Sequence, residues 1–302
     1  MQLTSSRQDH FVRRSLLTVP AINGRALEKA VTLSCDGIIF DLEDSVAPEM
    51  KAEARDKLRN FMKNSPLGLR EGIIRINGVD TPFLDADLDL VASVRPDAVL
   101  IPKVETPEDL ILIAERLKAK DATQGLSLWA MIETPKGVLN AGAIAALGRN
   151  GGGLLDCFVV GLNDLRKATG IPREPNRTYL VPFLMQILLA ARAHGLSAID
   201  SVSNDFRDIE AFGPECAQGR AMGYDGKMLI HPAQIEPANQ HFGPSDGEIA
   251  EARAIIEAFS TPEAANLNVI NLDGKMVERL HLEDAERLMA QIQIIERRKT
   301  IA

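Results

Sequence analysis

The chain has 302 residues, of which 45% are hydrophobic, so it can bury a full core as one large barrel or as two ordinary domains. Its formal net charge of -8, with acidic and basic residues interspersed, excludes a basic surface suited to nucleic acid and a polybasic stretch suited to a membrane. The three cysteines, Cys35, Cys157 and Cys216, show no CxxC spacing, which argues against a zinc site or a disulfide framework.

Taken in chain order, the first 15 residues are basic but lack an apolar segment followed by a small-residue cleavage site. No later apolar run approaches the about 18 residues of a membrane span. We therefore expect a cytoplasmic protein. From residue 16 onward, short apolar runs alternate with longer segments whose apolar residues have helical spacing. The predicted strands are 16–19, 37–40, 73–76, 98–101, 128–132, 157–160, 197–199 and 227–230, and the helical segments include 25–34, 51–63, 108–118, 136–147 and 180–194.

This alternation predicts repeated βα units and a parallel sheet. Eight strands with intervening helices favour an α/β fold of the closed (β/α)8 TIM barrel type. The alternative is an open doubly wound sheet, but no GxGxxG motif opens a helix after the first strand. The triple glycine at 151–153 precedes a strand, so we interpret it as a loop.

The predicted barrel domain covers residues 1–243, and residues 244–302 form a C-terminal extension. The extension is predicted to contain a helix at 248–259, a strand-like run at 267–271, a turn at Asp273 and Gly274, and a closing helix from about residue 282. Two interpretations stay open. The extension packs on the outer helices, or it is a lid over the barrel mouth, its own or a neighbour's.

In a parallel barrel, reactive residues are expected just past the carboxyl ends of the strands. The polar residues at these positions are Asp41, Glu43, Asp44, Arg75, Asn77, Lys103, Glu105, Glu133, Asn163, Asp164, Asp200 and His231. Carboxylates without a His or Cys cluster suit a hard cation, and a site with two protein ligands is typical of magnesium. Glu133 and Asp164 are the candidate ligands. The structural alternative is helix N-capping for Asp164, and interaction with a helix dipole for Glu133.

The arginine at the end of the third strand, Arg75, is predicted to point into the mouth and clamp a carboxylate. The alternative for Arg75 is a structural ion pair, and Asp41 is equally able to pair with a barrel cation. Glu43 and Asp44 are candidates to hold metal-bound waters. For the single polar residues Lys103 and His231, a structural role is at least as well supported as a functional one.

Seven segments resemble, in order, the citrate lyase beta-subunit-like and malyl-CoA lyase family of the HpcH/HpaI aldolase superfamily. They are RRSLLTVP, FDLEDSVAPEMKAEAR, IIRINGVDTPF, VLIPKVET, MIETPKGVLNAGAIAA, VVGLNDL and DGKMLIHPAQI. The resemblance implies a (β/α)8 barrel with a C-terminal extension, assembled as a homotrimer or a multiple of it, and a Mg2+ site at the barrel mouth.

Carried over by motif, the resemblance makes Glu133 and Asp164 the metal ligands and Arg75 the residue that binds the 2-keto acid. It places Glu43 and Asp44 near the metal waters, and the ALEKA helix implies Lys29 as a contact to coenzyme A. Related lyases have an aspartate in a GKMID or GRLVD motif that handles a proton, where this chain has Glu278. Its reach is one methylene longer, which puts that proton transfer and the usual substrate in question.

The resemblance implies a Mg-dependent carbon-carbon lyase that cleaves or forms a 3-hydroxyacyl-CoA, such as malyl-CoA or citramalyl-CoA, from an acyl-CoA thioester and a 2-keto acid. Arg75 and Glu278 are the implied catalytic groups. Three alternatives stay open: a thioesterase or synthase of the same family, an aldolase that needs no coenzyme A, and a carrier-protein-binding beta subunit of a citrate lyase-like complex.

Overall fold

The computed structural model describes residues 11–148, 152–172, 177–264 and 267–301. They form two compact units: Arg13–Phe242, and a second unit built mainly from residues that follow Phe242. Gly151 of the triple glycine lies outside the described residues, and Gly152 and Gly153 lie in the predicted loop. No helix in the described part of the chain is long and apolar enough to cross a membrane.

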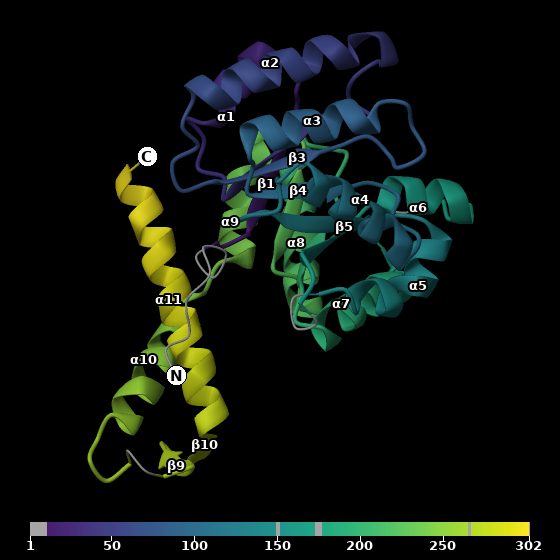
Figure 1. Cartoon of the computed structure of the whole chain (residues 1–302). Coiled ribbons are helices and arrows are strands. Elements are labelled where there is room, and N and C mark those ends of the chain that lie inside the picture. The colour runs from purple at the N-terminus through teal and green to yellow at the C-terminus, as the bar shows by residue number, and fades with distance from the viewer. Residues whose placement is uncertain (1–10, 149–151, 173–176, 265–266, 302) are drawn as a thin grey trace. The chain divides into compact units, whose positions relative to one another are not determined.

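The first unit is a closed barrel of eight parallel strands in sequential order, surrounded by helices (Figure 1). The strands are β1 (Ser15–Pro20), β2 (Gly37–Asp41), β3 (Glu71–Arg75), β4 (Ala98–Ile101), β5 (Ser127–Ile132), β6 (Leu155–Val160), β7 (Ser197–Asp200) and β8 (Gly226–Leu229). The helices are α1 (Gly24–Ala30), α2 (Lys51–Asn64), α3 (Leu84–Val94), α4 (Pro107–Ala119), α5 (Pro135–Ala145), α6 (Leu162–Thr169), α7 (Val181–Ala193), α8 (Ile209–Met222) and α9 (Ile235–Phe242). The predicted (β/α)8 barrel is confirmed.

Alternation along each strand divides the core into two apolar clusters. One lies between the strands and the helices, and includes Leu17, Val19 and Phe40. The other fills the barrel interior, and includes Leu16 and Ile39. Successive side chains of a strand point to opposite faces, so residues two apart share a face.

The strand registers arrange the interior side chains in layers of four, each drawn from alternate strands. Two successive layers are wholly apolar. They are Leu16, Ile73, Trp129 and Ile199, and then Ile39, Leu100, Val159 and Met228. The next layer toward the carboxyl ends of the strands contains Thr18, Arg75, Met131 and Ser201. The barrel interior therefore turns polar toward the carboxyl ends of the strands, which is the end expected to carry the chemistry.

The opposite, N-terminal end of the barrel is closed by Arg13. Its guanidinium donates to both carboxylate oxygens of Glu71 at 2.7 and 2.8 Å, and to Asp156 at 2.6 Å. It also donates to the Ser197 hydroxyl at 2.8 Å and lies 4.7 Å from the ring centroid of Trp129. Every donor group of this guanidinium has a partner, so we assign this cluster to stability.

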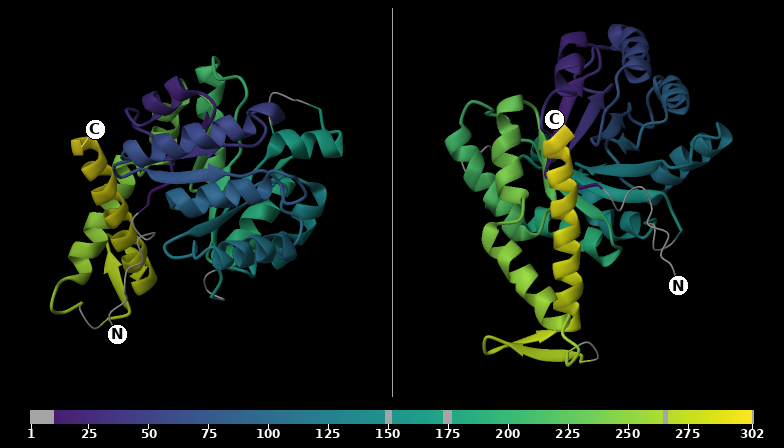
Figure 2. Two further views of the ribbon diagram at one scale, coloured as in Figure 1. Left: turned by 45° about the horizontal axis from the view of Figure 1, so that its top comes forward. Right: turned by 90° about the vertical axis from the view of Figure 1, so that its left-hand side faces the viewer.

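The second unit consists of α10 (Asp246–Phe259), the antiparallel strands β9 (Val269–Leu272) and β10 (Lys275–Glu278), and α11 (Arg279–Ile301). The two helices lie side by side, with the strand pair at one end of α11 (Figure 2). Asp273 and Gly274 have positive φ angles of 52° and 81°, as a tight hairpin turn requires. The predicted turn is present, and α11 begins three residues before the expected 282 because β10 runs directly into it.

Candidate active site at the barrel mouth

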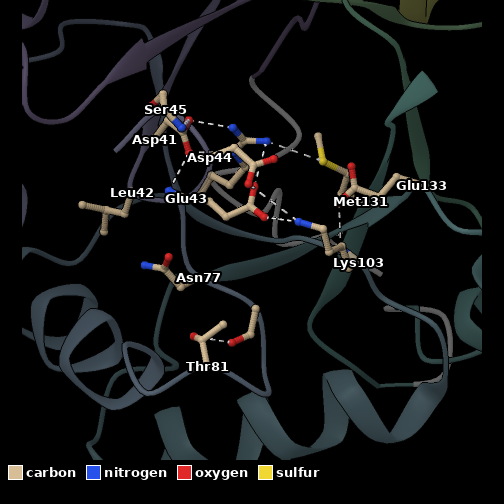
Figure 3. Close-up of polar contacts among 12 residues, drawn as sticks. Asp41, Leu42, Glu43, Asp44, Ser45, Asn77, Thr81, Lys103, Met131 and Glu133 are labelled. Carbon is tan, nitrogen blue, oxygen red and sulfur yellow. Dashed lines mark hydrogen bonds and ion pairs between the residues drawn. The ribbon is translucent and has the colours of Figure 1, made fainter. Parts of the chain in front are cut away.

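Charged residues from four neighbouring βα connections gather above the polar layer of the barrel. Asp41 ends β2 and Glu43 follows it, Arg75 ends β3, Lys103 follows β4, and Glu133 follows β5. Hydrogen bonds and ion pairs connect the first four to one another. Figure 3 shows the Lys103 side chain beside Glu43, and Glu133 bonded to the backbone of Lys103. The mouth therefore combines buried carboxylates with two cations.

Arg75 pairs with Asp41 on the adjacent strand, where the register sets the two residues side by side. Nε donates to Oδ1 at 2.7 Å and Nη2 to Oδ2 at 2.6 Å. Burial alone would raise the pKa of the Asp41 carboxyl, but Arg75 outweighs it and lowers that pKa below its usual value. The third nitrogen, Nη1, lies 3.9 Å from the Met131 sulfur and 3.2 Å from Oε2 of Glu43. Nη1 is thus ion-paired with Glu43 but is the one nitrogen of the guanidinium without a hydrogen bond to a carboxylate.

Glu43 is 5% exposed and lies between two cations. Its Oε1 accepts a hydrogen bond from the ammonium of Lys103, whereas its buried Oε2 accepts none, despite its distance of 3.2 Å from Nη1 of Arg75. Burial raises the pKa of Glu43 although both cations oppose this rise. The backbone of the loop is fixed by Lys51, whose ammonium donates to the carbonyl oxygens of Leu42 and Glu43, both at 2.8 Å.

Glu133 is 3% exposed, and its Oε1 accepts a hydrogen bond of 2.9 Å from the backbone N–H of Lys103. Its Oε2 faces Gly161, where an added Cβ would lie 2.3 Å from that oxygen. Any other residue at position 161 would displace the carboxylate. The sequence analysis did not identify Gly161, although a glycine directly after a strand and before an acidic helix turn signals such a close approach.

Burial, followed by the negative charges of Asp164 and Glu43, raises the pKa of Glu133 to about 8. Asp164 lies in the first turn of α6, but the N-cap of that helix is Gly161. The capping alternative for Asp164 is therefore not what the structure shows. The backbone N–H of Leu162 donates to the Ser201 hydroxyl at 3.1 Å, which ties the start of α6 to β7.

The acids at the mouth fit a divalent cation. Glu43 has an oxygen without a hydrogen bond, and the pKa of Glu133 is raised by burial and by two neighbouring carboxylates, so a cation would relieve an existing repulsion. Among the described residues, no group of three or more His, Cys, Asp or Glu side chains is arranged to hold a metal ion. A cation bound by Glu133 and Asp164 would take its other ligands from water or substrate oxygens, as magnesium commonly does.

Three other polar residues from the strand ends have structural partners. Asp200 is fully buried and pairs with Lys227 at 3.1 Å and with Arg177 at 2.7 Å, on the outer side of the barrel wall. Asn77 donates its backbone and side-chain N–H groups to Asp87, and Glu105 pairs with Lys136 at 3.2 Å. These residues organise the loops and do not join the carboxylate cluster.

The remaining five candidates make no hydrogen bond or ion pair with Glu133 in the described structure. His231 accepts the backbone N–H of Ala233 and stacks on Phe206 with ring centroids 4.4 Å apart, and Asn163 exchanges hydrogen bonds with Asn204. Asp44 is exposed, 3.9 Å from the Lys103 ammonium. Lys29 is exposed in the last turn of α1, away from the mouth, whereas Arg25 is exposed in its first turn. Glu278 ends β10 in the second unit.

Comparison with known proteins gives a consistent set of matches. Residues 14–232 match the family model HpcH/HpaI aldolase/citrate lyase. A (3S)-malyl-CoA thioesterase from Cereibacter sphaeroides is 46% identical over 282 residues, which cover 93% of this chain and 95% of the relative. The mitochondrial citramalyl-CoA lyase of Homo sapiens is 31% identical over 293 residues, which cover 94% of this chain and 86% of that protein.

Among solved structures, the CitE protein from Mycobacterium tuberculosis in complex with magnesium, acetoacetate and coenzyme A is similar, with a TM-score of 0.71 and 29% identity. The match covers 92% of this chain and 97% of that chain. It therefore extends over most of both compact units of this chain.

Proposed function

The chain belongs to the HpcH/HpaI aldolase/citrate lyase family, and from this premise we propose that it acts on a malyl-type 3-hydroxyacyl-CoA with a divalent cation at the barrel mouth. We propose that its reaction is hydrolysis of the thioester, in which water adds and the 3-hydroxy acid and the free thiol of coenzyme A leave. The 46% identity to a (3S)-malyl-CoA thioesterase supports hydrolysis. The buried acids beside Arg75 support the substrate class.

In this proposal, Glu133 and Asp164 hold Mg2+, which is present in the related CitE structure. The cation supplies Lewis acidity to a substrate oxygen. Arg75 binds the free carboxylate of the substrate through Nη1, because Asp41 already occupies its other two nitrogens. The Arg75–Asp41 pair fixes the guanidinium plane, so the substrate carboxylate is bound in one orientation.

Carbon-carbon cleavage, the reaction expected from the sequence, is the second candidate. Here the hydroxyl of the substrate loses its proton, the bond between the two carbons breaks, and the acyl-CoA enolate is protonated while a 2-keto acid is released. The citramalyl-CoA lyase among the relatives favours it. The same acids and arginine serve both reactions, since each begins with a bound 2-hydroxy acid end.

We also propose that the unit after Phe242 acts as a lid, and that Glu278 handles the proton in a neighbouring subunit of a homotrimer or a multiple of it. A single-chain mass for the active enzyme in light scattering would exclude this arrangement. Lys29, exposed on α1, is the proposed contact to the coenzyme A nucleotide.

The test is to incubate the purified protein with Mg2+ and racemic malyl-CoA or citramalyl-CoA, following free thiol and 2-keto acid separately. Thiol without keto acid establishes hydrolysis, and keto acid without thiol establishes carbon-carbon cleavage. Both products should disappear with EDTA and in the Glu133→Gln variant. If neither product forms, the proposal is wrong, and the carrier-protein-binding alternative is then tested by pull-down with acyl carrier protein.

A further inference from the structure

Lys103 has a backbone conformation that is unusual for its position. Its φ angle is 51°, in the left-handed region, which costs a non-glycine residue about 1–2 kcal/mol. The other described non-glycine residues with positive φ are Arg95, Asp121 and Asp273, which lie at helix ends or in the hairpin turn, where this conformation is common. Lys103 instead follows a barrel strand at the mouth, and backbone strain of this kind clusters at functional sites.

The conformation has a direct structural consequence for Glu133. The backbone N–H of Lys103 points across to the next strand and donates to Oε1 of Glu133 at 2.9 Å. The carboxylate is 3% exposed, and Gly161 leaves no space behind its other oxygen. The orientation of Glu133 therefore depends on the φ angle of Lys103.

The side chain of Lys103 has a different partner. Its ammonium bonds to Oε1 of Glu43, from the β2 connection, and Figure 3 shows the side chain directed toward that carboxylate. Oε2 of Glu43 lies 3.2 Å from Nη1 of Arg75 without a hydrogen bond. Without the ammonium, Glu43 would be free to form a hydrogen bond to Nη1, and this closer pair would compete with a substrate carboxylate for Arg75.

We propose that Lys103 is a positioning residue with two separable roles. Its left-handed backbone sets Glu133 for the cation, and its ammonium binds Oε1 of Glu43 and so keeps Glu43 from forming a hydrogen bond to Nη1 of Arg75, which leaves this nitrogen able to bind the substrate carboxylate. The inference rests on the proposed function, because it takes Glu133 as a metal ligand and Arg75 as the anion-binding residue.

Three substitutions separate the two roles. Lys103→Asn and Lys103→Gly remove the ammonium, but both residues tolerate the left-handed region. Lys103→Val also removes the ammonium, and its β-branched side chain disfavours that region. The control is Lys136→Met, since Lys136 is also a mouth lysine, 60% exposed and paired with Glu105, but it contacts neither Glu43 nor Glu133 in the described structure.

The first readout is Mn2+ binding to the metal-free protein, followed by electron paramagnetic resonance without substrate. Loss of an interaction that orients a metal ligand costs about 10–100-fold in affinity, so Lys103→Val should weaken Mn2+ binding by about 10-fold or more. Lys103→Asn and Lys103→Gly should remain close to the wild type. If both bind Mn2+ as weakly as the valine variant, the backbone role is wrong.

The second readout is the KM for malyl-CoA at saturating Mg2+. All three Lys103 variants should raise it by about 10-fold, the effect of one lost charge-assisted contact, with Lys136→Met unchanged. An unchanged KM in Lys103→Asn overturns the role of the ammonium. Because Lys103→Gly meets the backbone requirement, these comparisons stand even if the valine variant fails to fold. If the wild type binds no Mn2+, or Glu133→Gln binds it equally well, the proposed function fails instead.

Discussion

Replacing Glu133 with glutamine should make the metal-free protein more stable while abolishing its response to metal. Glu133 is 3% exposed, and burial together with Asp164 and Glu43 raises the pKa of its carboxyl from 4.5 to about 8. Glutamine keeps the oxygen that accepts from the Lys103 N–H. Its amide adds a donor toward the neighbouring acids and cannot ionise.

The magnitude follows from linkage between protonation and folding. At pH 7 the unfolded chain has Glu133 ionised and the folded metal-free protein has it protonated, so folding must bind a proton against a difference of about 2.5 pH units, which costs about 3 kcal/mol. Because the pKa of Glu133 is raised in the folded state, this cost is absent below pH 4.5. The folded protein loses stability as the pH rises from 4.5 toward 8. The variant avoids this loss, and its melting temperature should rise by about 6 °C at about 2 °C per kcal/mol.

The assay is thermal unfolding at pH 5 and pH 8, with EDTA and with excess Mg2+. In EDTA, the two proteins should differ more at pH 8 than at pH 5. In Mg2+ at 100 times its Kd, only the wild type should gain stability, by about 2.7 kcal/mol. Glu108→Gln, an exposed substitution at the start of α4, is the control and should change neither result. A Glu133→Gln protein that melts below the wild type in EDTA at pH 8 would refute the reasoning.

Three further predictions test other parts of the molecule. Arg13→Met leaves the buried Glu71 carboxylate without its main partner, so the free energy of unfolding in urea should fall by about 3–5 kcal/mol. The kcat should be retained at low temperature, and a fall in unfolding free energy below about 1 kcal/mol would contradict the role given to Arg13. Gly161→Ala places a methyl 2.3 Å from Oε2 of Glu133, so calorimetric Mn2+ titration should show at least about tenfold weaker binding, and unchanged binding would contradict the close contact. Glu278→Gln should leave Mn2+ binding intact and reduce kcat by about 100-fold, and full activity would exclude proton transfer by Glu278.

The barrel was predictable because its signal is repeated. All eight apolar runs became strands, with boundaries shifted by only a few residues. Helices α3, α6, α8 and α9 were not among the segments identified, and α8 shows why: it contains Gly213, Pro214 and Gly219, which weaken helical periodicity. It forms nevertheless because Phe212 and Cys216 bury against the barrel, so tertiary packing outweighs propensity.

For the candidate site, the residue types were predictable but their directions were less so. Asp200 ends a strand, as Asp41 and Arg75 do, yet it faces the helices. Strand alternation explains the difference, because Ile199 points into the barrel and the next residue must point outward. The contact between the Lys103 backbone and Glu133 depends on a left-handed φ angle at a lysine, which no sequence pattern signals.

The buried charges at the two ends of the barrel have different partners, and this contrast supports the proposal that the mouth is the functional end. At the N-terminal end, Arg13 satisfies Glu71 and Asp156 with direct hydrogen bonds, an arrangement that adds stability and needs nothing further. At the mouth, Glu133 has a backbone N–H as its partner and two acids as neighbours, so its ionised form is disfavoured until positive charge arrives. The protonated carboxyl of Glu133 is already out of water in the metal-free protein. A cation that binds there therefore does not have to remove water from this ligand. Metal affinity should therefore increase with pH up to about 8, as each bound cation displaces the proton of Glu133.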